Sequence, residues 1–307
     1  MVDQVIALLA GTAADALAWS GRLVGLATLV VGLQTLVGHR ELAPGGALDV
    51  RLVRLLARQQ SDQWVFRVLR SKDISPTGVA VVVALAQCIA GAALVTRPSL
   101  WPLYVVLLLA SLAVAPVLRP GLDGADDMLR VLTAALALGG IAAGSYVGLT
   151  ATALFVGGVV ALAYFVAGLS KAQSVLWWSG RGLQGIVTTE YFGIRRVSQG
   201  PGWVFAFASW AVLLWESFFP LALLAPAPAA ALVATRALGF HLICGIVMGL
   251  DGFVLAFAAG LPCVVLTAAT VSEAVPAHVR LAIGGAFSAA VVAWLAYWLG
   301  RETRPTT

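Results

Sequence analysis

Apolar runs of about 20 residues recur along the whole chain and constrain its fold more than any other feature. A helix needs roughly 20 residues to cross a bilayer, whereas a membrane β-barrel would show alternating segments of about ten residues. Hydrophobic residues make up 61% of the 307 residues and charged residues only 11%, far from the composition of a soluble domain. The sequence therefore predicts an all-α integral membrane protein, a polytopic helical bundle.

The apolar runs predict about nine transmembrane helices. They cover residues 20–38, 76–96, 99–118, 128–147, 150–170, 202–224, 228–249, 252–271 and 279–299. Residues 1–19 could add a crossing, and the Gly-rich stretch 245–260 could break one. No polar stretch is longer than 39–75, so residues 1–307 are expected to form a single transmembrane domain with no extramembrane domain.

Two polar segments interrupt the apolar runs. Residues 39–75 carry several arginines, and their apolar residues are spaced for an amphipathic helix, which predicts a segment lying on the membrane surface. Residues 171–201 combine basic and aromatic side chains with glycines. This second segment is expected to be a re-entrant or cap loop, with its aromatic rings at headgroup depth.

The charges of the chain indicate how it is oriented. Its net charge of +5 comes from 19 Lys and Arg residues against 14 Asp and Glu residues, and many of the basic ones lie between apolar runs. In a membrane protein this pattern reflects orientation and lipid headgroup contact, and not nucleic-acid binding. With nine crossings, the basic loops 39–75, 119–127 and 171–201 lie on the cytoplasmic side, which predicts an outside N-terminus and an inside C-terminus.

The sequence offers little support for metal or nucleotide chemistry. Cys88, Cys244 and Cys263 lie within apolar segments without CxxC spacing, which is typical of core thiols. HExxH, P-loop and GxSxG motifs and His-rich metal spacing are absent from the sequence. No metal site is therefore expected.

The ionisable residues inside or at the ends of the apolar runs include Lys171, Glu216, Arg236, His241 and Asp251. A charge in hydrocarbon is costly unless it is paired, neutralised or able to reach the interface. Lys171, Glu216 and Arg236 could form one internal polar cluster, or Glu216 and Arg236 could simply pair and lock two helices. Taken alone, His241 is explained as well by a hydrogen-bonded histidine in the core.

Two blocks of sequence carry a family resemblance. Residues 164–171, Tyr-Phe-Val-Ala-Gly-Leu-Ser-Lys, followed by Trp-Ser-Gly at 178–180, resemble the hallmark of the HTTM family, the membrane domain of vitamin K-dependent gamma-carboxylase. Gly-Phe-His-Leu at 239–242 and the stretch 248–253 resemble the family's Phe-His segment and the apolar helix after it. The resemblance is most specific over about 160–265 and indicates a short, stand-alone, bacterial-type member in the plasma membrane.

The resemblance implies a chemistry for Lys171. It would be the base that deprotonates a reduced quinone of the vitamin K or menaquinone type, whose anion reacts with dioxygen to give an epoxide. Dioxygen and the reduced quinone would be co-substrates, with no tightly bound cofactor, metal or flavin. The chain lacks the large extramembrane domain of the carboxylases and any histidine between His39 and His241, so carboxylation of glutamate is not expected.

The predicted function is accordingly a membrane-embedded oxygenase or epoxidase, an oxidoreductase acting on a quinone or related phenol. Lys171 is the predicted catalytic base. Further residues are expected to line or tune the site: His241, Glu216, Tyr164, Trp178 and Arg236.

Other interpretations remain open. Lys171 could be an anchor that reaches to the interface. The protein could also be a non-enzymatic membrane protein for maturation, export or immunity of an apolar peptide. A transporter would predict an inverted repeat, for which the two halves show no convincing similarity. A closed apolar pocket ending at Lys171 would favour the enzyme, and a lateral groove would favour the peptide.

Overall fold

The computed structural model describes residues 12–42, 46, 76–118, 124–189 and 200–302. Within these ranges the regular structure is helical, with no strand. Seven helical segments of the described chain are long and apolar enough to cross a membrane. They are Ala13–Glu41, Thr77–Thr96, Tyr146–Ala172, Gly202–Leu224, Ala227–Met248, Asp251–Ala274 and Ala277–Arg301. The all-helical membrane architecture predicted from the sequence agrees with these segments.

The predicted number of nine crossings is not confirmed for the described residues. The helix α6 (Trp101–Leu118) qualifies only as a shorter apolar helix over Trp101–Ala113. The helix α7 (Gly124–Ile141) carries Asp126, Asp127 and Arg130 in its first two turns, and hydrocarbon disfavours such charges. It also runs from 124 to 141 where the apolar pattern predicted 128–147.

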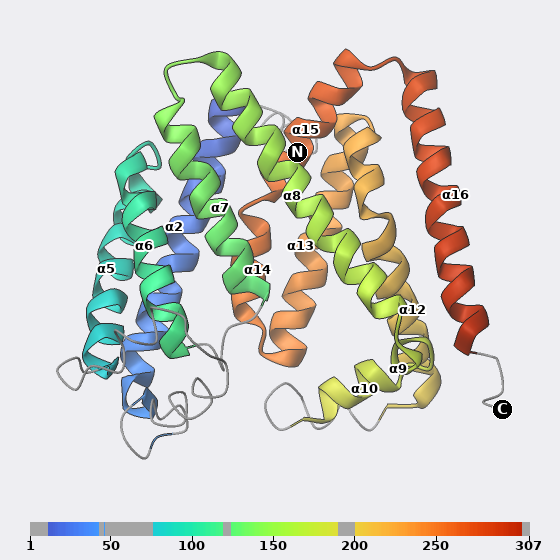
Figure 1. The fold of residues 1–307 in the computed structure, drawn as a ribbon, viewed down its shortest axis with the longest axis horizontal. Coiled ribbons are helices and arrows are strands. Elements are labelled where there is room, and N and C mark those ends of the chain that lie inside the picture. Colours follow the sequence, from blue (N-terminus) through green and yellow to red (C-terminus); the bar gives the residue numbers. More distant parts are fainter. Residues whose placement is uncertain (1–11, 43–45, 47–75, 119–123, 190–199, 303–307) are drawn as a thin grey trace, which may run out of the picture. The chain divides into compact units, whose positions relative to one another are not determined.

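The chain divides into two compact units. The N-terminal unit, Leu17–Thr152, holds most of α2 (Ala13–Val37), the 3-10 helix η1 (Gly38–Leu42), α5 (Pro76–Thr96), α6, α7 and the first turns of α8 (Tyr146–Ala172) (Figure 1). In this unit α6 packs against both α5 and α7. A Cβ on Gly25 of α2 would lie 2.8 Å from the carbonyl oxygen of Gly91 in α5, so small residues let these two helices approach closely.

The C-terminal unit comprises Met1–Ala16 and Ala153–Thr307. After α8 it contains α9 (Val175–Trp178), α10 (Arg181–Thr188), α12 (Gly202–Phe218), the 3-10 helix η3 (Phe219–Leu224), α13 (Ala227–Met248), α14 (Asp251–Ala258), α15 (Leu261–Ala274) and α16 (Ala277–Glu302). Every residue of α15 from Leu261 to Ala268 is buried, as expected of a helix that is apolar all round. By contrast, only 11% of the apolar 18-residue stretch of α16 is buried.

Glycine and proline determine where the helices of this unit end. Gly249, with φ +69°, ends α13 in the left-handed conformation that favours glycine. A second break at Ala259 and Gly260 separates α14 from α15. The run expected at 252–271 is thus interrupted by a turn, although Asp251–Ala274 as a whole remains one segment long and apolar enough to cross a membrane. The run 202–224 changes from α-helix to the 3-10 helix η3 at Phe219, beside Pro220, which cannot donate a backbone hydrogen bond.

The two predicted polar interruptions are only partly described. The amphipathic segment 39–75 lies outside the described residues, apart from the end of η1 and Gly46. Of 171–201, residues 171–189 form the end of α8 and the short helices α9 and α10, and 190–199 lie outside the described part. The position of this segment relative to a bilayer stays a prediction.

Candidate functional site

One face of α8 carries the residues around which the candidate site is built. Tyr164, Gly168 and Lys171 are spaced i, i+4 and i+7, which places them on the same side of a helix. Tyr164 is 1% exposed and Gly168 is buried, whereas Lys171 lies half-buried in the last turn. With a rise of about 1.5 Å per residue, the phenol and the ammonium attach to α8 about 10 Å apart along its axis.

Lys171 pairs with Glu216 of α12. Its Nζ donates to Oε2 of Glu216 over 2.6 Å. The side chain of Glu216 is only 6% exposed and that of Lys171 is 21% exposed. The ammonium also lies 5.3 Å from the centroid of the Trp177 ring, within the range of a cation–π interaction. A charge-assisted hydrogen bond therefore compensates the burial of the carboxylate.

Gly168 makes this pairing possible, because it lets the backbones of α8 and α12 approach. A Cβ at Gly168 would lie 2.5 Å from the backbone nitrogen of Ser217 and 2.9 Å from the carbonyl carbon of Glu216. No side chain fits into that space without moving one of the two helices. The glycine thus fixes the register that brings Glu216 to Lys171.

Tyr164 forms a second buried pair with His241 of α13. The phenol oxygen lies 2.6 Å from Nε2 of the imidazole, and His241 is 4% exposed. Phe219 stacks on the Tyr164 ring with centroids 4.0 Å apart, and Phe257 stacks on the imidazole at 4.4 Å. The other imidazole nitrogen, Nδ1, is buried without a hydrogen-bond partner among the described residues. The pair is therefore enclosed by aromatic rings on both sides.

Trp178 anchors the end of α8. Its indole Nε1 donates to the carbonyl oxygen of Ala172 over 2.7 Å, and Trp210 Nε1 donates to the Trp178 carbonyl oxygen over 3.1 Å. The two indole rings meet edge to face with centroids 4.6 Å apart. Gly180 then turns the chain with φ +77° against the backbone of Ala206. The Trp-Ser-Gly block accordingly holds α8, α9 and α12 together.

The structure brings together some of the predicted site residues and leaves others apart. Lys171 meets Glu216, and Tyr164 meets His241, so four predicted residues form two pairs. Arg236 is exposed on α13 and forms no ion pair with Glu216 in the described chain. Neither the three-residue cluster nor the alternative Glu216–Arg236 pair is therefore found.

Several residues of the site were not predicted from the sequence. Phe219 and Phe257 enclose the Tyr164–His241 pair, and Gly168 sets the helix approach. The spacing of Gly168 and Lys171 on one helix face was the signal that could have identified the glycine. Phe219 and Phe257 had no such signal, because one phenylalanine in an apolar run resembles any other.

The chemistry of the described site is that of an amine, a carboxylate, a phenol and an imidazole. Among the described residues no group of three or more His, Cys, Asp or Glu side chains could hold a metal ion. No family model, curated protein or solved structure matches the chain. The fold and the site thus define a helical membrane protein with two buried polar pairs, and membership of the HTTM family stays a prediction.

Proposed function

We propose that this chain is a membrane-embedded oxygenase in which Lys171 deprotonates a reduced quinone or a related phenol for reaction with dioxygen. The observation that carries the proposal is the Lys171–Glu216 pair at the end of an apolar helix. Hydroquinones and dioxygen both concentrate in lipid, so a base at the edge of hydrocarbon is well placed for both reactants. The resemblance of residues 164–171 to the HTTM hallmark supports the same role for Lys171.

The pair offers a way for Lys171 to act as a base. An amine accepts a proton only when it is uncharged, and the Glu216 carboxylate, 2.6 Å away, can take the proton of the ammonium. The neutral amine then removes a proton from the substrate hydroxyl and becomes an ammonium again. One oxygen atom of dioxygen enters the ring as the epoxide, and the other leaves as water with the two hydroxyl hydrogens of the hydroquinone.

The Tyr164–His241 pair would support the site without contacting the substrate, because Phe219 and Phe257 already cover its two rings. Trp177, whose ring centroid lies 5.3 Å from the Lys171 ammonium, is an aromatic side chain beside the proposed base and would contact a substrate ring there.

The test is mass spectrometry of the products formed when the purified protein in detergent receives reduced menaquinone or vitamin K under oxygen. Wild-type protein should add one oxygen atom to the quinone. Lys171→Ala should abolish this product, and so should Lys171→Ala combined with Glu216→Gln, which leaves no buried carboxylate unpaired. Gln173→Ala, at an exposed position of the same segment, is the matched control and should retain full activity.

Either of two results would count against the proposal. Turnover that persists in the folded double variant would show that Lys171 is not the base. An unchanged quinone with well-folded wild-type protein would exclude these quinones as substrates and would leave a related phenol or the peptide function.

A second candidate function, the handling of an apolar peptide, is favoured by a groove between η3 and α16. The groove has a volume of about 580 Å³ and includes Leu221, Leu224 and Leu281 in its lining. Arg280, at the same place, donates to the backbone carbonyls of Val275 and Leu224. The Arg280 guanidinium is thus hydrogen-bonded to the backbone of Val275 and Leu224. The groove therefore suits an apolar segment.

The two functions can be separated by filling this groove. A Cβ on Gly284 would lie 3.7 Å from both Leu221 and Leu224, so Gly284→Phe would project a ring between them. For a peptide function, the variant should lose crosslinking to an apolar helical peptide that carries a photoreactive leucine. Undiminished crosslinking in Gly284→Phe would rule out the groove as the peptide site.

A further inference from the structure

Arg236 is a charged residue inside an apolar helix that the proposed function does not use. It belongs to α13 and lies about 14 Å along the axis from the first residue of that helix and about 18 Å from the last, at about 1.5 Å per residue. The hydrocarbon core of a bilayer is about 30 Å thick. In a helix that crosses the membrane, Arg236 is therefore near the middle of the hydrocarbon.

The side of α13 that carries Arg236 differs from the side that carries the candidate site. His241, five residues later and about 140° further round the helix, is buried against Tyr164. Arg236 itself is exposed. Other residues at helical spacing from it are exposed as well, namely Leu232 at 52%, Ile243 at 62% and Ile246 at 73%. These three residues and Arg236 form one stripe, called here the Arg236 face.

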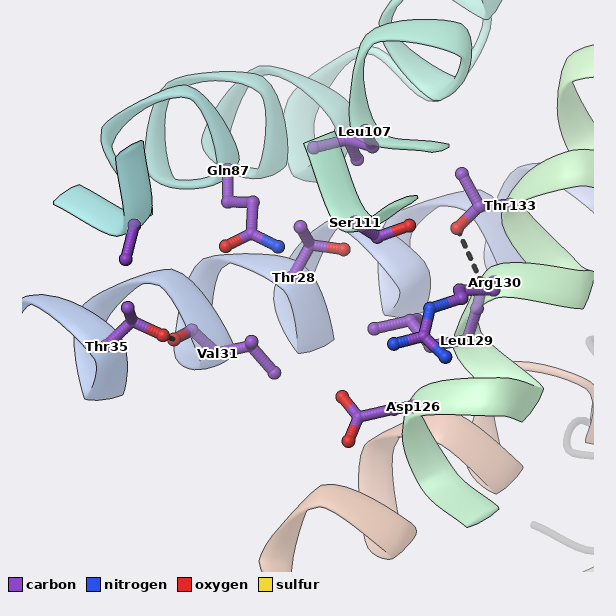
Figure 2. A pocket seen from close by; sticks show the side chains of 11 residues that line it. Thr28, Val31, Thr35, Gln87, Leu107, Ser111, Asp126, Leu129, Arg130 and Thr133 are labelled. Atoms are coloured by element: carbon purple, nitrogen blue, oxygen red, sulfur yellow. Dashed lines mark hydrogen bonds between the residues drawn. The ribbon is translucent and has the colours of Figure 1, made fainter. Parts of the chain in front are cut away.

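The charge of Arg236 is not compensated within the described chain, where its side chain has neither an ion pair nor a hydrogen bond. Arg130 of α7 has the compensation that Arg236 lacks. Its Nη1 donates to Asp127 over 2.6 Å, and Figure 2 shows Asp126 one turn away on the same helix. Basic side chains near helix ends avoid hydrocarbon by reaching the interface, whereas Arg236 lies more than two turns from both ends of α13. A counter-charge is therefore expected from another molecule.

The shape and charge of the Arg236 face decide which kind of molecule fits it. A Cβ on Gly239, one turn from Arg236, would meet nothing within 4 Å, so a second helix can approach the backbone of α13 at this point. Two copies of this chain joined symmetrically by this face would place one Arg236 against the other, and like charges oppose such a contact. A different helix with a carboxylate at the same depth would instead accept charge-assisted hydrogen bonds from the guanidinium.

We propose that the Arg236 face binds a transmembrane helix of another protein that carries Asp or Glu near the middle of its apolar segment. The carboxylate of the partner pairs with the Arg236 guanidinium, and the partner helix packs over Gly239 and the exposed isoleucines. Pairing offsets the cost of placing either charge in hydrocarbon. The inference depends neither on the proposed oxygenase function nor on the groove between η3 and α16, because Arg236 belongs to neither site.

The experiment measures fluorescence energy transfer between the labelled full-length protein and synthetic helical peptides in nanodiscs. The peptides are Leu- and Ala-rich, about 20 residues long, and identical except for Asp, Leu or Lys at the central position. Wild-type protein should bind the Asp peptide roughly tenfold more tightly than the Leu peptide. Arg236→Leu should lose this preference, and Arg236→Glu should prefer the Lys peptide. Gly239→Leu should weaken binding of the Asp peptide, because its side chain would fill the space that the partner needs.

Arg97→Leu is the matched control, because Arg97 is also exposed but lies just beyond the end of α5. Gly158→Leu is the control for Gly239→Leu, since a Cβ at Gly158 of α8 also meets nothing within 4 Å. Both controls should bind the peptides like the wild type. Equal binding of the Asp and Leu peptides by wild-type protein would overturn the proposal. A preference for Asp that survives in folded Arg236→Leu, or that is lost equally in Arg97→Leu, would overturn it as well.

Discussion

The two partners of the Lys171–Glu216 pair differ in their access to water. With 21% of its side chain exposed, Lys171 can extend its ammonium toward solvent, whereas Glu216, at 6%, cannot. Removing the lysine therefore leaves a buried carboxylate that must take up a proton. Removing the carboxylate leaves an ammonium that can reorient.

We expect Lys171→Ala and Glu216→Gln to lower the free energy of unfolding by different amounts. Breaking a buried pair costs about 3–5 kcal/mol when the remaining charge stays buried. Lys171→Ala should approach that range at neutral pH, and Glu216→Gln should cost clearly less. The double variant should be more stable than Lys171→Ala alone. Thermal unfolding of the four proteins in one detergent measures this, and additive effects of the two substitutions would contradict the pairing.

Tyr164 should contribute to stability through its hydroxyl group. Tyr164→Phe removes the partner of His241 Nε2 in a site whose Nδ1 is already unpaired. Leaving a buried polar group unsatisfied costs about 1–3 kcal/mol. Tyr146→Phe, in the same helix but 79% exposed, should change stability by no more than about 0.5 kcal/mol. Equal effects of the two substitutions in denaturation experiments would argue against a structural role of the Tyr164–His241 bond.

At the scale of elements, the contact between α8 and α12 depends on one missing side chain. Gly168→Ala would place a methyl group against the backbone of Ser217, and such overpacking costs about 1–3 kcal/mol. The same substitution at Gly158, also in α8, meets nothing within 4 Å and should stabilise the helix by about 0.5–1 kcal/mol. Opposite signs of the two shifts in unfolding temperature are expected, and two shifts of the same sign would refute the argument.

The helices were largely predictable because each apolar run is about as long as a helix that crosses the hydrocarbon core of a bilayer. Every predicted run contains a helix, and α5 was placed at its observed bounds. The ends of α7 were misplaced because Asp126 and Asp127 lie in its first turn, where acidic residues favour a helix although they oppose membrane insertion. The 3-10 turn at η3 was missed because its residues are as apolar as the helix before it.

Part of the site was predictable from ionisable residues that interrupt apolar runs, and Tyr164 and Trp178 were expected from the family resemblance. Lys171, Glu216 and His241 stood out on that criterion, but the sequence could not assign their partners. Arg236 met the same criterion and lies exposed instead. Partner choice depends on how α8, α12 and α13 rotate about their axes, and the close contacts that fix these rotations are not visible in hydropathy.

At the scale of the whole molecule, the reactivity of the three cysteines can be used to measure how well each unit is buried. None of the three cysteines forms a disulfide in the described chain; Cys244 and Cys263 are buried, whereas Cys88 is half-buried. A thiol reagent should label Cys88 first and the other two only after denaturation. Intact mass spectrometry counts the labels, with the denatured protein as control for complete reaction. Rapid labelling of Cys263 in folded protein, or a mass gain upon reduction alone, would contradict this arrangement.

The sparse burial of α16 sets it apart from the other apolar helices of transmembrane length. A helix that shares so little of its surface with its neighbours gains most of its free energy from insertion into lipid, and little from packing. A thinner bilayer, or removal of the lipid, would then lower the stability of α16 before that of α15, because α15 is buried by the surrounding protein. Hydrogen exchange in nanodiscs and in short-chain detergent would show this as early deuteration of the last helix alone. The stability of the C-terminal end is thus a property of the bilayer as much as of the polypeptide.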